Sequence, residues 1–414
     1  MQKKIEIMSP VGSYESLAAA IQGGAGSVYF GVGSLNMRSR SSQNFSLDDL
    51  AEISRRCREN NVRSYLVLNT IIYDEELETM QRYIDAAKAN HISAIIASDI
   101  SVMEYARSQG VEVHISTQCN VTNIEAVRFY ARYADVIVLA RELTLKQTYA
   151  ITQAIEQEEI KGPSGNLAQI ELFVHGALCM AVSGKCYLSL DNFNSSGNRG
   201  ACFQPCRRGY IVKDKENELE LEIDHEYIMS PKDLKTIDFL DRILKAGVTV
   251  LKIEGRGRSP EYVKVVTECY HEAVEAYQTG IFTEEKIEQW NKKLSGVYNR
   301  GFWDGYYLGR KMGEWTDKYG SLALKKKVYI GKITNFFANL NVAEIKMEAS
   351  RLRLGDEIRI LGETTGVVED VVDEIRVDLK PVEQCEKGIY CSIPSKILLR
   401  RGDKVYKVID ADFD

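Results

Sequence analysis

The chain has 414 residues, of which 44% are hydrophobic and 27% charged, and its formal net charge at pH 7 is −6. This composition excludes a largely disordered chain, and the acidic balance excludes the overall basic field that marks many nucleic-acid binders. The start, MQKKIEIMSPVG, contains no apolar run of signal-peptide length, and no later segment is as long and apolar as a membrane span. We therefore expect a cytoplasmic protein with reduced cysteines, no membrane contact, and only local contacts with any RNA.

Short apolar runs alternate with amphipathic helical stretches from the N-terminus onward. The expected strands span residues 5–8, 27–31, 63–69, 93–97, 112–116, 136–139, 169–174 and 249–253. The expected helices span residues 14–22, 47–60, 75–90, 100–109, 124–133, 145–157, 232–245 and 260–278. Eight such alternations predict an α/β fold, a (β/α)8 TIM-like barrel over residues 1–280, with a doubly wound sheet as the alternative.

Polar side chains come just after most of the expected strands. They include Asn69, Gln118, Arg141, Glu142, His175, Glu254 and Arg256, and Lys252 lies on the last expected strand. The carboxyl ends of barrel strands meet at one face, where barrel enzymes carry their active sites. We therefore expect these residues at a common site, the alternative being the ordinary polarity of turns.

A cysteine-rich insert follows the seventh expected strand, within ELFVHGALCMAVSGKCYLSLDNFNSSGNRGACFQPC at residues 171–206. Four of the nine cysteines lie there, Cys179, Cys186, Cys202 and Cys206, separated by six, fifteen and three residues. Thiolates bind soft metals, and the glycines of this run let the backbone wind tightly. The spacing favours an iron–sulfur cluster over zinc, because only the last two cysteines resemble the tight pairs of structural zinc sites. Buried free thiols and disulfides are the alternatives.

Other cysteines have simpler explanations. Cys57 and Cys269 lie within expected helices, so we expect them to be dispensable for a metal site. Cys385 and Cys391 lie in the C-terminal region, where we expect them in a core because free cysteine is commonly buried.

Beyond the barrel the pattern changes twice. Residues 281–324 contain the aromatic and glycine-rich run GVYNRGFWDGYYLGRKMGEW, which we expect to pack against the barrel, a stacking surface for bases being the alternative. From residue 325 polar and apolar residues alternate between Gly-Asp turns, which predicts a small all-β, antiparallel barrel over residues 325–414. Basic clusters in this region suit either a solvated rim or an RNA-docking surface. They are Lys325 to Lys327, Arg351 with Arg353, and Arg400 and Arg401 with Lys404.

The run Glu171-x-Phe173-x-x-Gly176-Ala177-Leu178-Cys179-x4-Gly184-x-Cys186-x-Leu188-Ser189 resembles the signature of the collagenase-like U-class peptidase family. Runs similar to the same family are SPVGS at 9–13, VYFG at 28–31, STQCN at 116–120, LAREL at 139–143, SPKDL at 230–234, KIEGR at 252–256 and NRGF at 299–302. The resemblance covers essentially the whole chain, and the last domain resembles the second domain of translation GTPases. Within the family, the layout is similar to the prephenate-dependent tRNA uridine hydroxylases.

This resemblance implies an RNA-modifying enzyme that forms 5-hydroxyuridine at the wobble position of tRNA, with prephenate as the oxygen donor. It also implies a 4Fe–4S cluster, for which the four cysteines of the insert are the matching positions. Relatives that hydroxylate ribosomal RNA or a quinone precursor define one alternative function. A collagenase-like peptidase defines another, against which stand five scattered histidines and the absence of His-Glu-x-x-His and Gly-x-Ser-x-Gly motifs.

Prephenate carries two carboxylates, so the implied reaction needs cationic partners. Arg141 and Arg256 each follow a strand, and each can form a bidentate fork to a carboxylate. We expect Glu254 and Asn69 to bind substrate beside them. The alternative is that the cations form structural ion pairs with Glu142 or Glu254.

Three residues are the candidates for catalysis, His175, Gln118 and Lys252. They can orient the substrate or move protons at the C-terminal face of the barrel. The alternative for His175 is a core position in which the backbone satisfies the imidazole, and the alternative for Lys252 is again a structural ion pair.

Overall fold

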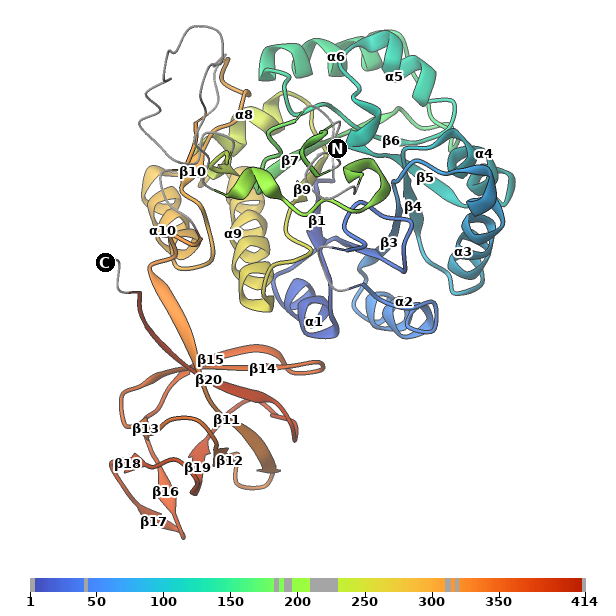
Figure 1. Ribbon diagram of the computed structural model, residues 1–414. Coiled ribbons are helices and arrows are strands. Elements are labelled where there is room, and N and C mark those ends of the chain that lie inside the picture. The colour runs from blue at the N-terminus through green and yellow to red at the C-terminus, as the bar shows by residue number, and fades with distance from the viewer. Residues whose placement is uncertain are drawn as a thin grey trace, which may run out of the picture.

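The computed structural model describes residues 4–40, 44–181, 186–189, 196–208, 230–309, 314–316 and 320–411. Eight parallel strands form a closed barrel (Figure 1). They are β1 (Glu6–Pro10), β2 (Ser27–Gly31), β3 (Arg63–Leu68), β4 (Ala94–Ala97), β5 (Glu112–Ile115), β6 (Val136–Val138), β7 (Gln169–Gly176) and β9 (Val250–Ile253). Strand β9 pairs with both β1 and β7, which closes the ring and confirms the predicted TIM-like barrel over the open doubly wound sheet.

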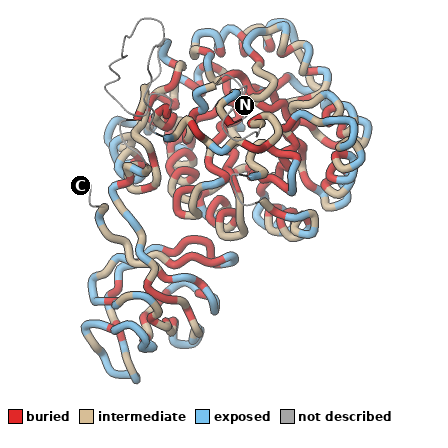
Figure 2. The backbone as a smooth tube through the Cα atoms, in the orientation of Figure 1, coloured by how far each residue is buried: buried red, intermediate tan, exposed pale blue. Residues whose placement is uncertain are grey.

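Helices surround the barrel with their buried residues toward its centre (Figure 2), and the last of them packs against the helix before it. They are α1 (Tyr14–Gln22), α2 (Leu50–Glu59), α3 (Leu77–Ala89), α4 (Ile100–Ser108), α5 (Ile124–Tyr130), α6 (Leu145–Gln157), α8 (Leu240–Lys245), α9 (Pro260–Gln278) and α10 (Glu284–Ser295). Short 3-10 helices are η1 (Asp74–Glu76), η2 (Thr117–Cys119), η4 (Gly197–Arg199), η5 (Pro205–Arg207) and η6 (Ile237–Phe239). On α6, Thr148, Ile151, Thr152 and Ile155 are buried, which is the spacing of one helix face. None of the helices in the described ranges is long and apolar enough to cross a membrane.

The prediction of one helix over residues 232–245 is wrong. Strand β8 (Asp233–Lys235) comes first, pairing antiparallel with the end of β7 and parallel with β10 (Phe302–Trp303), and helix α8 covers only the last part. Asp233 is 1% exposed and lies 3.5 Å from both Arg258 and Arg300, which come from distant segments. These long-range contacts stabilise residues 233–235 as a strand. The local spacing of apolar residues contains no sign of such contacts, so it predicted a helix.

The aromatic segment after α10 packs against the barrel, as predicted. Trp303 and Tyr307 are buried, and the Tyr307 hydroxyl donates a hydrogen bond of 2.7 Å to the Phe173 carbonyl on β7. This contact places aromatic rings next to the C-terminal end of the barrel, where Trp303 and Tyr306 also line a cavity.

The C-terminal region consists of antiparallel strands around a core of its own. The strands are β11 (Lys325–Phe337), β12 (Val342–Met347), β13 (Leu352–Arg353), β14 (Glu357–Gly362), β15 (Gly366–Val371), β16 (Arg376–Val377), β17 (Lys380–Pro381), β18 (Gln384–Cys385), β19 (Tyr390–Pro394) and β20 (Lys404–Asp410). An eight-stranded sheet runs β15-β14-β20-β11-β12-β19-β16-β17, and β13 pairs with β18. Cys385 and Cys391 are buried in this core, which confirms their predicted position.

The C-terminal region packs on the outside of α1 and α9 (Figure 1). The Gln22 side chain at the end of α1 donates to the Thr365 carbonyl and accepts from the Val367 N–H. Gly366 between them has φ +69°, and a Cβ there would lie 2.4 Å from Gln22 Oε1, so only glycine fits. Lys327 of the first basic cluster pairs with Glu261 of α9 at 2.8 Å, so this lysine helps to join the two parts of the chain.

Candidate functional site

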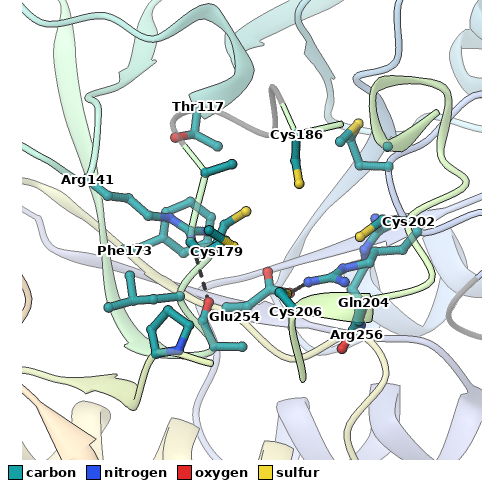
Figure 3. Close-up of a pocket in the computed structure, with 18 of the residues that line it drawn as sticks. Thr117, Arg141, Phe173, Cys179, Cys186, Cys202, Gln204, Cys206, Glu254 and Arg256 are labelled. Atoms are coloured by element: carbon teal, nitrogen blue, oxygen red, sulfur yellow. Dashed lines mark hydrogen bonds and ion pairs between the residues drawn. The ribbon is translucent and has the colours of Figure 1, made fainter. Parts of the chain in front are cut away.

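A cavity of about 380 Å³ opens at the C-terminal ends of the barrel strands. All of the predicted site residues except His175 line it. They are Asn69, Gln118, Arg141, Cys179, Cys186, Cys202, Cys206, Lys252, Glu254 and Arg256. Figure 3 shows the four cysteines around the same space, with Arg141 against the Phe173 ring on one side. The fold therefore brings together residues that lie up to 187 positions apart in the chain, since Asn69 and Arg256 share one cavity.

The four cysteines of the insert are free thiols, as are the other five cysteines, so no disulfide forms. Burial is the main cause that raises the pKa of the Cys206 thiol to about 11; Arg207 opposes this shift, and the other three cysteines add to it. These mutual effects show that the four sulfurs are close enough to interact. Within the described ranges, no three Cys, His, Asp or Glu side chains converge closely enough to hold one metal ion.

Arg207 fixes the cysteine segment to its surroundings. Its guanidinium donates to the carbonyls of Leu178 at 2.6 Å and Pro231 at 2.9 Å, and to the Ser230 hydroxyl at 3.1 Å. Gln204 has φ +54°, a left-handed turn that comes two residues before Cys206. Arg207, next to Cys206, thus connects the backbone beside Cys179 to residues 230 and 231, and these hydrogen bonds help to hold the thiols around the cavity.

The cavity has a surplus of positive charge around one buried carboxylate. Burial alone raises the pKa of Glu254, but Arg38, Arg141 and Arg256 outweigh burial and lower this pKa to about 2. Arg38 makes the direct ion pair with Glu254, at 2.9 Å. Three guanidinium groups facing one carboxylate leave net positive charge for an anionic ligand.

Arg141 and Arg256 are held by neutral groups and not by the ion pairs with glutamate that were the alternative to substrate binding. Arg256 donates to Asn36 Oδ1 at 3.0 Å, and burial lowers its pKa to about 10. Arg141 donates to the Ala177 carbonyl at 3.3 Å and lies 3.9 Å from the Phe173 ring centroid, in a cation–π contact. The buried Arg141 Nε has no hydrogen-bond partner. Both guanidinium groups therefore face the cavity without a carboxylate of their own.

Sequence reasoning missed Arg38 and Asn36, which follow β2 in the run LNMRSR. The signal that could have found them is the same one, polar side chains in the loop that follows a barrel strand. Asn69, in contrast, lies where it was predicted. Its side chain accepts from the Met37 N–H and donates to the Ser116 hydroxyl, so it connects three loops of the cavity rim.

Lys252 lies at the floor of the cavity and forms a buried ion pair. Its Nζ is 2.7 Å from Glu171 Oε1 on β7, and its partner is therefore neither Glu142 nor Glu254. The Tyr29 and Phe173 rings lie 4.9 and 5.4 Å from the same Nζ. This lysine is both part of a structural pair and accessible to a molecule in the cavity.

His175 lies outside the cavity, in the packing between β7 and α9. The rings of Tyr262, Tyr270 and Phe302 surround the imidazole at centroid distances of 5.7 to 6.0 Å. Burial, together with smaller effects of Lys235 and Arg258, lowers the pKa of His175 to about 3. The position favours a core histidine over a catalytic one.

The buried imidazole predicts acid sensitivity. In the unfolded chain His175 takes up a proton below a pKa of about 6.5, but the folded protein resists protonation down to about pH 3. Its contribution to stability is therefore present above pH 6.5 and is lost as the pH falls. We expect the free energy of unfolding to drop by about 2 kcal/mol between pH 7 and pH 5 from this residue alone. Denaturant titrations of the wild type and of His175→Phe should show that the variant loses this part of the pH slope.

The matched control for that experiment is His271→Gln, since His271 is an exposed histidine on α9 beside Glu275. This variant should keep the wild-type slope. An unchanged slope in His175→Phe would contradict the assignment of His175 as a buried neutral group.

The chain is similar to known proteins over most of its length. A family model described as peptidase family U32 matches residues 12–317. A collagenase of Porphyromonas gingivalis strain W83 is 58% identical over 402 residues, which are 97% of each chain. The tRNA hydroxylation protein P1 of Bacillus subtilis is 31% identical over 385 residues, 90% of this chain and 88% of that one. The 23S rRNA 5-hydroxycytidine C2501 synthase of Escherichia coli is 36% identical over 275 residues, 66% of this chain and 40% of that one.

Proposed function

The chain belongs to peptidase family U32, and we propose that it is an RNA hydroxylase of that family, which acts on a tRNA wobble uridine with prephenate as the oxygen donor. The observation that carries the proposal is the joint lining of one cavity by four cysteine thiols and a surplus of arginines. Hydroxylation of an aromatic base carbon needs redox chemistry that side chains do not supply. Relatives named for tRNA and rRNA hydroxylation support the same reaction class.

Cys179, Cys186, Cys202 and Cys206 would hold an iron–sulfur cluster, which would supply the redox chemistry. A single zinc ion draws its thiolates to about 2.3 Å, so their sulfurs lie within about 4 Å of one another. No three ligands in the described ranges converge in that way. A cluster instead binds each thiolate at a different iron, so it accepts sulfurs that are farther apart, and four thiols with no other ligand type suit it.

Arg141 and Arg256 would bind the two carboxylates of prephenate. Glu254 makes its direct ion pair with Arg38, which leaves the hydrogen-bond donors of the other two guanidinium groups for the substrate. Arginine can donate two parallel hydrogen bonds to a carboxylate, and this geometry orients the ligand as well as binding it. Gln118 and Asn69 can complete the orientation from the rim.

An RNA base would reach the cavity past exposed aromatic side chains. Tyr187 is 78% exposed and Phe203 is 45% exposed, and each comes directly after a cavity-lining cysteine. Unpaired bases stack on such rings, and bases in an anticodon loop are already partly unstacked. These features support a loop substrate rather than a duplex.

A peptidase is the second candidate, because relatives at 58% and 53% identity are named collagenase. Serine or cysteine nucleophiles need an adjacent base, most often histidine. No histidine is among the described residues that line the cavity, and His114 and His175 are buried elsewhere. The described lining of the cavity therefore lacks the histidine base that a peptidase needs, but it contains the thiols and arginines that the proposed hydroxylase needs.

The test is mass spectrometry of tRNA nucleosides from a strain that lacks this protein. We expect derivatives of 5-hydroxyuridine to disappear, and to return when the wild-type chain is supplied. Loss of a hydroxylation on ribosomal RNA or on a quinone, with tRNA unchanged, would move the proposal to a relative's substrate. Hydrolysis of gelatin by the purified, iron-free protein would contradict it in favour of the peptidase.

A further inference from the structure

A row of ionisable side chains crosses the interior of the barrel, from the floor of the cavity to the opposite end. Its members are Lys252 on β9, Glu171 on β7, and His114 and Glu112 on β5. The interior of such barrels is normally filled by apolar, branched side chains. Burying charged groups there costs free energy unless they have partners, so a row of four such groups is unusual.

The distances along the row are short. Lys252 Nζ lies 2.7 Å from Glu171 Oε1, and His114 Nε2 lies 3.0 Å from Glu112 Oε1. Between these two pairs, His114 Nδ1 lies 3.9 Å from Glu171 Oε2. Glu112 also pairs with Arg63 at 2.6 Å. The distance between His114 and Glu171, which is slightly longer than a hydrogen bond, is thus the one gap in the row, between the Lys252–Glu171 pair and the His114–Glu112 pair.

The gap is bordered by two unsatisfied atoms. His114 Nδ1 and Glu171 Oε2 are both fully buried, and neither has a hydrogen-bond partner. One water can bond to both atoms whichever ring nitrogen carries the proton, and a small rotation can connect them directly when Nδ1 carries it. A network that served only stability would have no need of two unpaired polar atoms at its centre.

The two ends of the row meet different surroundings. Lys252 lines the cavity beside Tyr29, whereas the Glu112 side chain is 31% exposed at the start of β5. Starts of barrel strands lie at the end opposite the cavity. The row therefore joins the two ends of the barrel through its closed interior.

Other titratable groups touch the row from neighbouring strands. The Tyr65 ring lies 4.5 Å from the His114 ring, and the Tyr65 hydroxyl donates to Glu6 Oε1. Glu6 also accepts from the Ser27 hydroxyl and lies 4.0 Å from Arg63. Glu6 is thus a carboxylate at the same end of the barrel as Glu112, but it is not in the row.

We propose that Lys252, Glu171, His114 and Glu112 form a proton path between the floor of the cavity and solvent at the far end of the barrel. Its use in turnover rests on the proposed function, whereas its connectivity does not. When the Lys252 ammonium gives a proton to a molecule in the cavity, the Glu171 carboxylate takes a proton from His114 and passes it to the Lys252 amine, and Glu112 carries the replacement from water to His114. One proton enters and one leaves, and no electron moves. Lys252 is the catalytic residue, and the other three act through it.

The connectivity is tested without turnover, by NMR of the full-length chain labelled with 15N in histidine. His114→Gln assigns the signals. In Lys252→Met the unpaired Glu171 carboxylate should draw a proton into the Glu171–His114 pair, so the His114 ring nitrogens should shift. Glu6→Gln is the matched control and should leave them in place. If the His114 signals shift in Glu112→Gln but stay unchanged in Lys252→Met, then His114 and Glu171 are not connected and the proposed path is wrong.

Turnover gives the second readout. Glu171→Gln keeps the shape of the side chain but cannot pass a proton, and we expect it to slow hydroxylation about 100-fold. In Glu112→Gln the hydroxylation rate should be limited by direct protonation of His114 from water. The rate should therefore fall about tenfold for each pH unit above neutrality. Glu6→Gln should keep the wild-type pH profile. Wild-type rates and profiles in the first two variants would overturn the path and leave the proposed function standing.

If the wild type shows no hydroxylation, the proposed function fails and the NMR result alone decides on the path. The two hypotheses therefore fail separately.

Discussion

Replacing Cys179, Cys186, Cys202 or Cys206 by serine is expected to remove most of the iron from protein purified without oxygen. The four thiols line one cavity, and the other three lie close enough to Cys206 to affect its pKa, so each is expected to provide one ligand. Changes outside the ligand shell alone lower metal affinity about 10–100-fold, and loss of a ligand should cost more. The measurement is the amount of iron and sulfide per chain, together with visible absorption, for the wild type and the four single variants.

Three other cysteines provide the controls. Cys57 and Cys269 are buried on α2 and α9, and their alanine variants should keep the full iron content. Cys119 is the closest match, since it follows the cavity-lining Gln118 but donates its thiol hydrogen to the Ser98 carbonyl. Full iron retention in any of the four serine variants would remove that residue from the ligand set. One zinc per chain in place of iron and sulfide would remove the cluster altogether.

Most of the barrel could be predicted from the sequence because its strands are buried on both faces. Runs such as YLVL in β3 and AIIA in β4 are short, apolar and bounded by polar turns, which is what parallel strands require. The 232–245 segment could not be predicted in this way. Its strand depends on pairing with β7 and β10, and on two arginines that hold Asp233, none of which leaves a local pattern.

The cavity was predictable for a different reason. In a TIM barrel the residues that follow the strands meet at one face, wherever they lie in the chain. Individual partners were not predictable. Glu254 lies 216 positions from Arg38, and Lys252 lies 81 positions from Glu171, so neither ion pair is visible as a motif. His175 shows the limit of the rule, because it ends a strand but points into the packing around α9 rather than into the cavity.

Replacing Arg141 or Arg256 by alanine is expected to weaken prephenate binding about tenfold to a hundredfold. Each guanidinium faces the cavity and lacks a carboxylate partner of its own, so each can form a charge-assisted fork to one carboxylate of the ligand. Loss of such a bond costs about 1.5–3 kcal/mol. The measurements are the Kd for prephenate by calorimetry and the KM for prephenate in hydroxylation of purified tRNA.

Lysine at the same positions separates charge from geometry, because lysine keeps the positive charge but cannot form the planar fork. Arg141→Lys and Arg256→Lys should therefore recover only part of the affinity. Arg55→Ala is the remote control, since Arg55 is an exposed residue on α2 that pairs with Glu52 and Glu59. Iron content and tRNA affinity should stay at wild-type values in all of these variants, because the hydrogen bonds of the two guanidinium groups go to Ala177 and Asn36 and not to a cysteine. Wild-type prephenate affinity in both alanine variants would show that the surplus positive charge serves another ligand, and the RNA phosphate would then be the group to test at these two arginines.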